Sequence, residues 1–364
     1  MYPVDASRKV VIAPLDWGLG HATRIIPIIR YLVDSGRSVT VAATPVGINV
    51  IRTEFPTLEY LTIPGYAMDY PRNGRYFLLH MIRRLPRLMA AIRREHRWLR
   101  DAQRIHRWDL IISDNRYGFR HPEVPSVFIT HQLNIRTEIS SGVDYLVKKL
   151  NHAIIARFDA CWIPDQERWP GLAGNLSHGV IPSRARYIGP LSRLTPQPSL
   201  QRSGLLIMLS GPEPQRTLIE TRILKAMKTY QGKVTLVRGL PDAPGIPAMH
   251  AHHTILNHLP AAALGRCMAE AELVICRAGY SSVMDLVHMG TPAVLIPTPG
   301  QTEQEYLARH LEHEGYFPRI TQEEFTLEGA LRMAATFHFR TDKPDFLTHL
   351  SLLDEVLPGP QTSF

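Results

Sequence analysis

The sequence predicts an α/β protein of two domains, each built on a parallel sheet with helices on both faces. The chain has 364 residues and is 45% hydrophobic, which is too much for one ordinary core and enough for two. Short apolar runs alternate with helical patterns in both halves, as parallel sheets of this class require. A polar stretch with two prolines lies between the halves and predicts a linker.

The first half opens with the apolar run 9–13, which predicts a buried strand. An amphipathic helix is expected from about His21 to Ser35, with Gly36 as its C-cap. Further strands are predicted at 38–42, 59–63, 109–113 and 126–130.

The second half repeats the alternation after the expected linker, with strands predicted at 205–209, 234–237, 273–276 and 293–296. A final helical segment is expected to pack back on the first half. We therefore predict an N-terminal domain, a linker, a C-terminal domain and a C-terminal segment, at 1–192, 193–203, 204–340 and 341–364.

The cysteine content and the hydropathy of the chain favour a cytoplasmic protein. Cys161, Cys267 and Cys276 are too few and too scattered for a disulfide framework, and no C-x-x-C pair occurs. The sequence shows no signal-peptide pattern and no run of the roughly 18 apolar residues that a membrane span needs. The net charge of +8 indicates an anionic partner, either nucleic acid, a phosphorylated small molecule or an anionic membrane surface.

A glycine turn, Asp16-Trp17-Gly18-Leu19-Gly20-His21, follows the first predicted strand and opens a helix. Backbone amides at such a turn can receive an anion or a polar substrate, so Gly18 and Gly20 are candidate binding residues. The rival interpretation is a dinucleotide fingerprint. Thr23 stands where its third glycine should be, and the second strand runs into Thr44-Pro45 without an acidic residue, which argues against it.

His21 is the candidate catalytic base of this turn. A histidine at the helix start would project into the crevice at the carboxyl ends of the strands. An imidazole with an ordinary pKa of about 6.5 is suited to take a proton from an attacking hydroxyl. A structural histidine is the alternative. Arg24, one turn later, either binds a substrate anion or is an ordinary surface arginine.

A second glycine turn, Cys276-Arg277-Ala278-Gly279-Tyr280-Ser281-Ser282-Val283-Met284-Asp285, joins a predicted strand to a helix in the second half. Gly279 allows close approach of the backbone, and Ser281 and Ser282 can cap the helix or bind phosphate oxygens. Asp285 could accept hydrogen bonds from ribose hydroxyls, or it could merely complement the helix dipole.

A third loop follows the next strand, with Gln301, Glu303 and Gln304 at the start of another helix. Amide and carboxylate side chains that point into the same crevice as Gly279 are suited to reading sugar hydroxyls. A solvated helix start is the alternative.

The segment from Leu256 to Gly315 resembles the C-terminal domain of the glycosyltransferase family that includes the bacterial enzyme adding N-acetylglucosamine to lipid I, a family 28-like domain. The resemblance is carried by Arg277-Ala278-Gly279, the serine pair, Asp285, Gly290-x-Pro292, Pro297, Glu303-Gln304 and Gly315. The loop Gly18-Leu19-Gly20-His21 resembles the glycine-histidine loop of that family, and 113–118 with 130–132 resembles a subgroup of predicted members.

This resemblance implies the GT-B fold, in which two Rossmann-like domains enclose a cleft. It also implies a nucleotide-sugar donor, most often a UDP-sugar, and inversion at the anomeric carbon. The donor-side residues would be Gly211, Arg216, Arg238, Leu259, Arg277, Gly279, Ser281, Ser282, Asp285, Gln301, Glu303 and Gln304. The acceptor side would contain Gly18, Gly20, Arg24, Asp114 and His131, with His21 as the base.

Two departures from the family pattern affect the donor site. Family members usually carry glutamate where Asp285 stands, and the shorter side chain would hold the ribose differently or favour another nucleotide. The loop 209–216 is poorer in glycine than the phosphate loop of the family, so Arg216 would supply charge in place of backbone amides.

The sequence predicts transfer without a metal ion or other cofactor, the nucleotide sugar being a substrate. No Asp-x-Asp pair occurs, so Arg216, Arg238, Arg277 and helix N-termini would meet the charge of the leaving diphosphate. The group His250, His252, His253 and His258 invites a zinc interpretation, which we reject because it lacks cysteines and a second ligand pair. Asp114 and His131 would bind the acceptor, orient His21 or serve the structure alone.

The basic stretch 72–107 mixes arginines with apolar residues. It predicts either contact with an anionic membrane surface, which would bring a lipid-linked acceptor within reach, or a helix with one core face and one solvated face. Nucleic acid is not expected, because no recognised binding motif accompanies the charge.

Two rival functions share these features. A non-hydrolysing nucleotide-sugar epimerase has the same architecture and needs no acceptor. A non-catalytic nucleotide-sugar-binding protein would keep the cleft for sensing, because fold alone does not guarantee activity.

Overall fold

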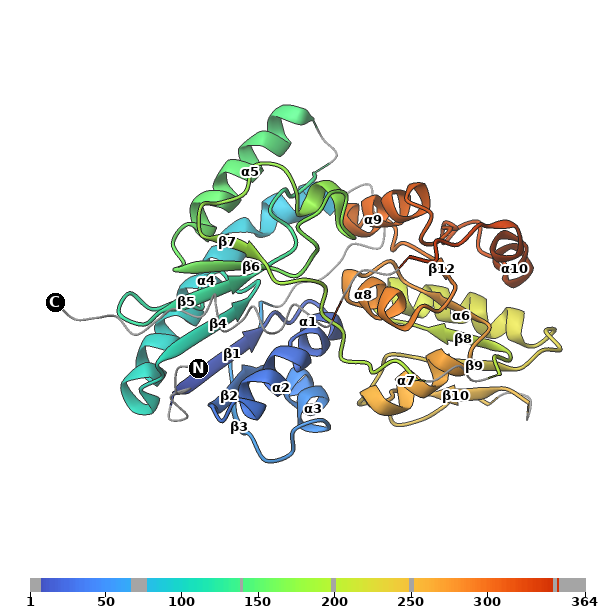
Figure 1. Ribbon diagram of the computed structural model, residues 1–364, viewed down its shortest axis with the longest axis horizontal. Coiled ribbons are helices and arrows are strands. Elements are labelled where there is room, and N and C mark those ends of the chain that lie inside the picture. Colours follow the sequence, from blue (N-terminus) through green and yellow to red (C-terminus); the bar gives the residue numbers. More distant parts are fainter. Residues whose placement is uncertain are drawn as a thin grey trace.

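The computed structural model describes residues 8–66, 77–137, 140–197, 201–248, 252–342 and 346. Two α/β units lie side by side, each with a central sheet between helices (Figure 1). The expected segment 341–364 falls almost wholly outside the described residues. Its residue Phe346 packs its ring 4.5 Å from that of His288.

The first sheet has seven strands, and each pair of neighbours is parallel. Its spatial order is β3-β2-β1-β4-β5-β6-β7, which reverses direction between β1 and β4. Ligands bind at such a switch point in open α/β sheets. The strands are β1 (Lys9–Pro14), β2 (Ser38–Ala43), β3 (Glu59–Thr62), β4 (Leu110–Asp114), β5 (Ser126–Ile129), β6 (Ala160–Ile163) and β7 (Ala185–Tyr187).

Five α-helices and a short 3₁₀ turn accompany this sheet among the described residues. They are α1 (Leu19–Arg24), α2 (Ile26–Asp34), α3 (Pro45–Arg52), α4 (Phe77–His106), α5 (Ser141–Ile155) and the 3₁₀ turn η2 (Gly174–Leu176). The single helix predicted from His21 to Ser35 is wrong, because it divides at Ile25 into α1 and α2. Pro27 in the first turn of α2 lacks the amide that would continue the helical hydrogen bonds.

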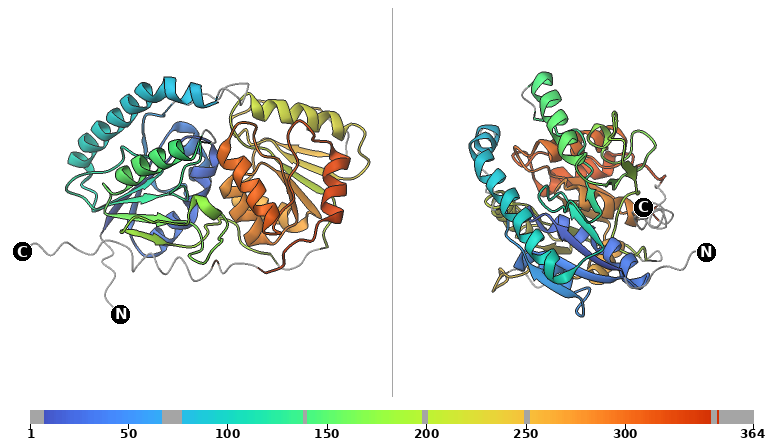
Figure 2. Two further views of the ribbon diagram at one scale, coloured as in Figure 1. Left: turned by 90° about the horizontal axis from the view of Figure 1, so that it is seen from above. Right: turned by 90° about the vertical axis from the view of Figure 1, so that its left-hand side faces the viewer.

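The second sheet has five parallel strands in the order β10-β9-β8-β11-β12, which reverses between β8 and β11. Its strands are β8 (Leu205–Met208), β9 (Val234–Val237), β10 (Thr254–Leu256), β11 (Leu273–Cys276) and β12 (Ala293–Leu295). The helices are α6 (Gln215–Met227), α7 (Ala261–Glu270), α8 (Tyr280–Met289), α9 (Thr302–His313) and α10 (Leu327–Thr336). Both sheets are seen with their covering helices in Figure 2.

Three strands were not predicted from the sequence: β6, β7 and β10. Each has three or four residues, and β7 and β10 lie at sheet edges. Such short strands carry too little apolar periodicity to be recognised alone.

The expected linker begins as a packed segment. Arg193 and Leu194 are 8% and 4% exposed, and the backbone amide of Leu191 contacts the sulfur of Met284 in α8. The chain crosses between the sheets after Tyr187 and before Leu205, so the crossing includes residues buried against α8 as well as polar ones. The prolines of the stretch predict a loop correctly but give no sign of this burial.

The two units contact each other through helices α1 and α8 (Figure 1). Ser281 Oγ donates to the carbonyl of Gly20 at 2.9 Å, and the Tyr280 hydroxyl donates to the carbonyl of Pro164 at 2.8 Å. One apolar cluster continues from the first unit into the second, with Leu172 and Tyr306 among its members. The two domains are therefore in direct contact through both polar and apolar groups.

Helix α4 has a core face and a basic face. Ala91, Glu95 and Leu99 are buried at helical spacing. Outward-facing arginines are Arg87, Arg93, Arg94, Arg97, Arg100 and Arg104. Among the helices of the described ranges, none combines the length and apolar character that a bilayer crossing needs.

A buried arginine holds α4 to the ends of β1 and β3. Asn115, in the left-handed region at φ 57°, turns the chain after β4 and sends Arg116 back into the protein. The fully buried Arg116 guanidinium donates to Glu95 of α4, to the carbonyl of Pro14 at 3.2 Å and to that of Pro64 at 2.7 Å.

We expect Arg116→Ala to lower the free energy of unfolding by about 3–5 kcal/mol, because it leaves the Glu95 carboxylate buried without its partner. The double variant Arg116→Met with Glu95→Leu should recover much of that loss. Urea unfolding followed by circular dichroism measures both. A single variant as stable as the wild type would show that this pair does not hold α4.

Candidate functional site

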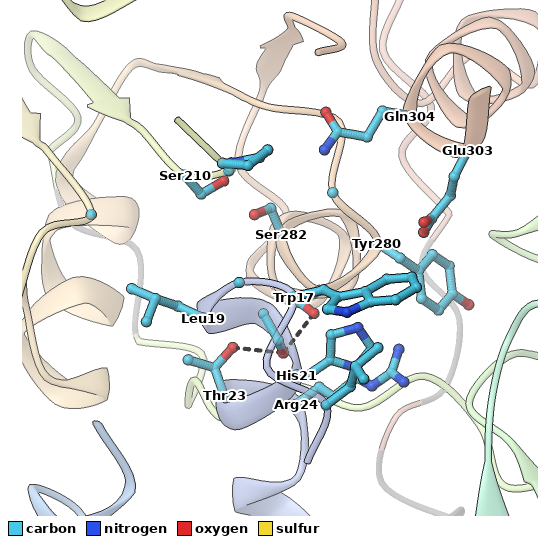
Figure 3. A pocket seen from close by; sticks show the side chains of 18 of the residues that line it. Trp17, Leu19, His21, Thr23, Arg24, Ser210, Tyr280, Ser282, Glu303 and Gln304 are labelled. Carbon is cyan, nitrogen blue, oxygen red and sulfur yellow. Dashed lines mark hydrogen bonds between the residues drawn. The ribbon is translucent and has the colours of Figure 1, made fainter. Parts of the chain in front are cut away.

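A cavity of about 450 Å³ opens where the carboxyl ends of the two sheets face each other. Its volume lies in the usual range for ligand pockets. The loops after β1, β4 and β5 form one wall, and those after β8, β9, β11 and β12 form the other. Figure 3 shows Trp17, His21 and Arg24 on one side and Ser210, Ser282 and Gln304 on the other.

His21 and Asp114 form a hydrogen-bonded pair in the N-terminal wall. The Nδ1 atom of His21 lies 2.9 Å from Oδ2 of Asp114, which ends β4 and is fully buried. Because a carboxylate only accepts hydrogen bonds, Nδ1 of His21 carries the proton and donates a hydrogen bond to Asp114. The lone pair of the neutral ring is therefore on Nε2, the atom available to a hydroxyl in the cavity.

Burial sets the protonation state of this pair. Burial is the largest influence on the pKa of His21 and lowers it, and the charge of Arg24 lowers it further. Asp114 opposes both without reversing the shift. Burial also raises the pKa of Asp114, but the charge of Arg24 and the hydrogen bond from His21 outweigh it and hold that pKa below its ordinary value. The pair thus consists of a neutral imidazole and a carboxylate at neutral pH.

Arg24 and His131 connect this pair to the C-terminal domain. Arg24 Nε donates to Asp114 Oδ1 at 2.9 Å, and its NH1 lies 3.2 Å from Nδ1 of His131. Nε2 of His131 lies 2.8 Å from Oε1 of Glu303, at the start of α9. The His131 ring also stacks on Tyr280 of α8, with centroids 4.1 Å apart.

The loops of the donor side reach the cavity at points where helices begin. Gly279 begins α8, and a Cβ placed there would meet no atom within 4 Å, so its backbone is open to a ligand. Ser282 lines the cavity beside it, whereas Ser281 bonds Gly20 across the cleft. Gly211, with φ 102°, turns the loop after β8 toward the same space.

Residues 259–336 match the model of the glycosyltransferase family 28 C-terminal domain. A UDP-N-acetylglucosamine--N-acetylmuramyl-(pentapeptide) pyrophosphoryl-undecaprenol N-acetylglucosamine transferase of Desulforudis audaxviator is 41% identical over 70 residues, 19% of each chain. The chain thus spans about a fifth of the length of the curated relatives it matches first.

Solved structures match over nearly the whole chain. The glycotransferase of kitacinnamycin superposes with a TM-score of 0.62 at 18% identity, over 91% of this chain and 90% of that one. Acinetobacter baumannii MurG superposes with a TM-score of 0.50 at 16% identity, over 96% and 93%. The chain has the GT-B fold. The predicted fold is confirmed, and the donor-side half resembles the family of lipid-I N-acetylglucosaminyltransferases.

In this GT-B cleft, most of the predicted site residues come together. Those that line the cavity are Gly18, Gly20, His21, Arg24, His131, Gly211, Leu259, Gly279, Ser281, Ser282, Asp285, Gln301, Glu303 and Gln304. Asp114 lies beneath His21 and reaches the cavity through it.

Three predicted arginines are not brought to the GT-B cavity. Arg216 bonds Glu213 at 2.6 Å and Glu220 at 2.8 Å, and Arg238 bonds Glu220 as well. These carboxylates neutralise both guanidinium groups beside α6. The structure therefore does not support the expectation that they meet the leaving diphosphate.

Arg277 lies behind the cavity instead of in it. It is 1% exposed and donates to Gln322 Oε1 at 2.6 Å and to the carbonyl of Gln215 at 2.9 Å. Burial lowers its pKa to about 10. Arg277 joins loops of the donor domain by hydrogen bonds, so it too does not have the predicted role at the diphosphate.

Asp285 lines the cavity with its carboxyl group already engaged. Oδ1 accepts from Ser192 Oγ at 2.6 Å, and the group lies beside the charge of Arg193. Burial raises its pKa to about 6, although Arg193 and Ser192 pull it down. A ribose would have to share this carboxyl with the segment that joins the domains.

Gln304 braces its own loop. Its Oε1 accepts from the amide of Thr298 at 3.0 Å, and its Nε2 donates to Gln301 Oε1. Glu303 is 33% exposed and is the member of the loop with a carboxylate at the cavity.

The histidines for which we rejected a zinc interpretation make other contacts. His253 Nε2 donates to the carbonyl of Met227 at 2.8 Å, His258 lines the cavity, and His250 lies outside the described residues. Across the part of the chain that the structure describes, no three His, Cys, Asp or Glu side chains are placed to hold a metal ion.

Sequence reasoning missed an apolar wall on the acceptor side of the cavity. Trp17, Tyr66, Leu88, Tyr117 and Ile135 form it, from five separate segments of the N-terminal domain. Trp17 lies beside the ring of His21 in Figure 3. The proximity of Trp17 to the glycine turn was a usable signal, but the others meet only through the tertiary fold.

Proposed function

We propose that this protein is an inverting, metal-independent glycosyltransferase that moves a sugar from a nucleotide-sugar donor to a hydroxyl acceptor. The observation that carries the proposal is the His21–Asp114 pair, which faces the glycine turn at Gly279 and the carboxylate of Glu303 within one cavity. The match of residues 259–336 to family 28 and the UDP-N-acetylglucosamine in the name of the Desulforudis audaxviator relative support a UDP-sugar as donor.

The chemical step is a single displacement. Nε2 of His21 takes the proton of the acceptor hydroxyl, whose oxygen attacks the anomeric carbon of the donor. The bond from that carbon to the diphosphate oxygen breaks, and the nucleoside diphosphate leaves with the electron pair. Attack opposite the leaving group inverts the anomeric configuration. Asp114 stabilises the imidazolium that forms, because its charge lies against Nδ1.

Backbone groups would receive the leaving diphosphate. No side chain caps the start of α8 after Gly279, and a helix start favours an anion. The loop at Gly211 lies across the same space. Because the three nearby arginines are bound to carboxylates or buried, these dipoles and the Ser282 hydroxyl are the groups suited to this task.

The acceptor would lie against the apolar wall. Trp17 and Tyr117 both line the cavity, and Trp17 lies beside His21 (Figure 3), so the part of the acceptor near its hydroxyl can be apolar. A lipid-linked acceptor delivered at a membrane surface is compatible with this wall.

Replacement of the base tests the function directly. We expect His21→Ala to reduce turnover by about 10²–10⁴-fold, because a positioned base contributes that much. Nucleoside diphosphate release is measured in EDTA with UDP-, dTDP- and GDP-sugars against a panel of hydroxyl acceptors, and product configuration by NMR.

The exposed His313→Ala serves as the control and should leave turnover unchanged. Near-normal turnover of His21→Ala would remove the base assignment. A retained anomeric configuration would remove inversion. Loss of activity in EDTA would remove metal independence, and interconversion of the donor sugar without acceptor would identify an epimerase.

The pH dependence of kcat/KM follows from the neutral base. His21 must be unprotonated, and burial and Arg24 hold its pKa below the ordinary 6.5. Activity should therefore be constant above that value and fall as the pH drops through the lowered pKa. Asp114→Asn removes the charge that raises the pKa of His21, so its acid limb should move to lower pH, with a lower plateau because the tautomer is no longer fixed. An acid limb above pH 7 would contradict this assignment.

The basic face of α4 supports peripheral contact with an anionic membrane through 72–107, of which 72–76 lie outside the described residues. The arginines of α4 from Arg87 to Arg104 are exposed, and α4 lies along the outside of the domain (Figure 2). Each basic residue near an anionic surface contributes about 1 kcal/mol.

We expect the protein to float with anionic vesicles and not with neutral ones, and to be released by salt. Arg93→Glu, Arg97→Glu and Arg100→Glu together should abolish flotation. The same reversal at exposed Arg157, Arg266 and Arg332 is the matched control. Equal recovery with neutral and anionic vesicles would refute the contact.

A further inference from the structure

A chain of polar contacts runs from the proposed base to the donor domain through two residues whose roles the proposed function leaves open. Asp114 accepts from both His21 and Arg24, Arg24 contacts His131, and His131 contacts Glu303. Arg24 and His131 are 3% and 2% exposed. Neither is free to move independently of its partners.

Arg24 fixes which atom donates in each of the two hydrogen bonds that His131 makes. A guanidinium group has donors and no acceptor. Its NH1 lies 3.2 Å from Nδ1 of His131, so that nitrogen must be the acceptor and carry the lone pair. The neutral His131 ring then has its proton on Nε2 and donates it to Glu303 Oε1 at 2.8 Å.

One arginine therefore orders two histidines in opposite tautomers. Arg24 holds Asp114 so that His21 keeps its proton on Nδ1, and it holds His131 with its proton on Nε2. His131 follows the end of β5 and Glu303 begins α9, so their bond spans the two domains. Stacking of His131 on Tyr280, which itself bonds the carbonyl of Pro164, fixes the ring in the plane that this bond needs.

We infer that Arg24 and His131 are positioning residues that hold Glu303 at the donor sugar from across the contact between the two domains, and that Arg24 at the same time orders the tautomer of the base. The inference rests on the proposed function. A carboxylate has two oxygens, and His131 occupies one of them. The second oxygen of Glu303, on a side chain that is one-third exposed, is left for a sugar hydroxyl.

The burial and charge of Glu303 agree with this arrangement. Burial raises the pKa of its carboxyl group, but the hydrogen bond from His131 and the charge of Arg24 lower it, and the net shift is downward. The carboxylate that results is acceptor-only. It can read hydroxyl donors of a sugar and cannot receive a phosphate.

His131→Phe separates the polar bridge from the packing, because the phenyl ring can still stack on Tyr280 but makes neither hydrogen bond. We expect the KM for the donor to rise about 10- to 100-fold, the loss typical of a hydrogen bond to a charged group. The change in kcat should be smaller, and the acid limb of the pH profile should stay, because His21 and Asp114 remain paired. His131→Gln offers an amide oxygen to Arg24 and an amide N–H to Glu303, so it should restore the KM to within about threefold.

A double-mutant cycle with Glu303→Ala tests the pairing. If His131 acts through Glu303, the double variant should have a KM no higher than the worse single variant. Effects that multiply in full, or a KM for His131→Phe equal to that of the wild type, would overturn the inference. His313→Phe, an exposed histidine on the same helix as Glu303, is the matched control and should change nothing.

A measurement without turnover keeps this result separate from the proposed function. In the ¹⁵N-histidine-labelled protein at pH 7.5, long-range ¹H–¹⁵N spectra distinguish protonated from unprotonated ring nitrogens, and the signals lost in His131→Phe assign the residue. We expect protonation at Nε2 alone. A His131 protonated at Nδ1 or at both nitrogens would overturn the inference even in an active enzyme. Failure of the wild type to release nucleoside diphosphate from any donor would count against the proposed function. The spectrum would still test whether His131 bridges Arg24 and Glu303.

Discussion

The buried carboxylate of Asp114 is the constraint on which the cleft depends. A carboxylate without solvent must be compensated, and Asp114 is compensated by His21 on one oxygen and Arg24 on the other. Both partners come from α1, so the helix after the glycine turn is held against the end of β4. The register of β1 beside β4, with Pro14 opposite Asp114, brings the two loops to the same edge of the sheet. The position of the proposed base is thus a consequence of satisfying one buried charge.

The same requirement extends across the domains. Asp114 does not use all the N–H donors of Arg24, and NH1 of Arg24 contacts Nδ1 of His131. The other ring nitrogen of His131 contacts Glu303. Further contacts lie beside this chain: Tyr280 stacks on the ring of His131, and Ser281 donates a hydrogen bond to the carbonyl of Gly20. Because interfaces between domains of one chain commonly permit relative motion, these directed polar contacts help to define how the two domains sit against each other.

Prediction from the sequence succeeded where local pattern and chemistry coincide. His21 follows a strand and a glycine turn, and Gly279 does the same in the second half, so each could be placed at the cleft from its neighbours alone. Arg216 and Arg238 show the limit. A positive charge near a predicted phosphate loop is informative only if no carboxylate reaches it first, and Glu220 lies one helical turn from Arg216 and contacts both. Strand β10 and the break at Ile25 were missed because three residues, or one proline inside an apolar helix, barely change the periodicity.

By itself the sequence determined the α/β class, the two-domain order, the glycine turns and the candidate base, because these follow from hydrophobic periodicity and from residue types adjacent in the chain. Only the tertiary structure decided which charges remain available. Asp114 is 93 positions from His21, and Glu303 is 172 positions from His131, yet each pair is in hydrogen-bond contact. Ionisable groups so far apart in the chain acquire their protonation states and partners only when burial removes water and leaves each one the neighbours that the fold supplies.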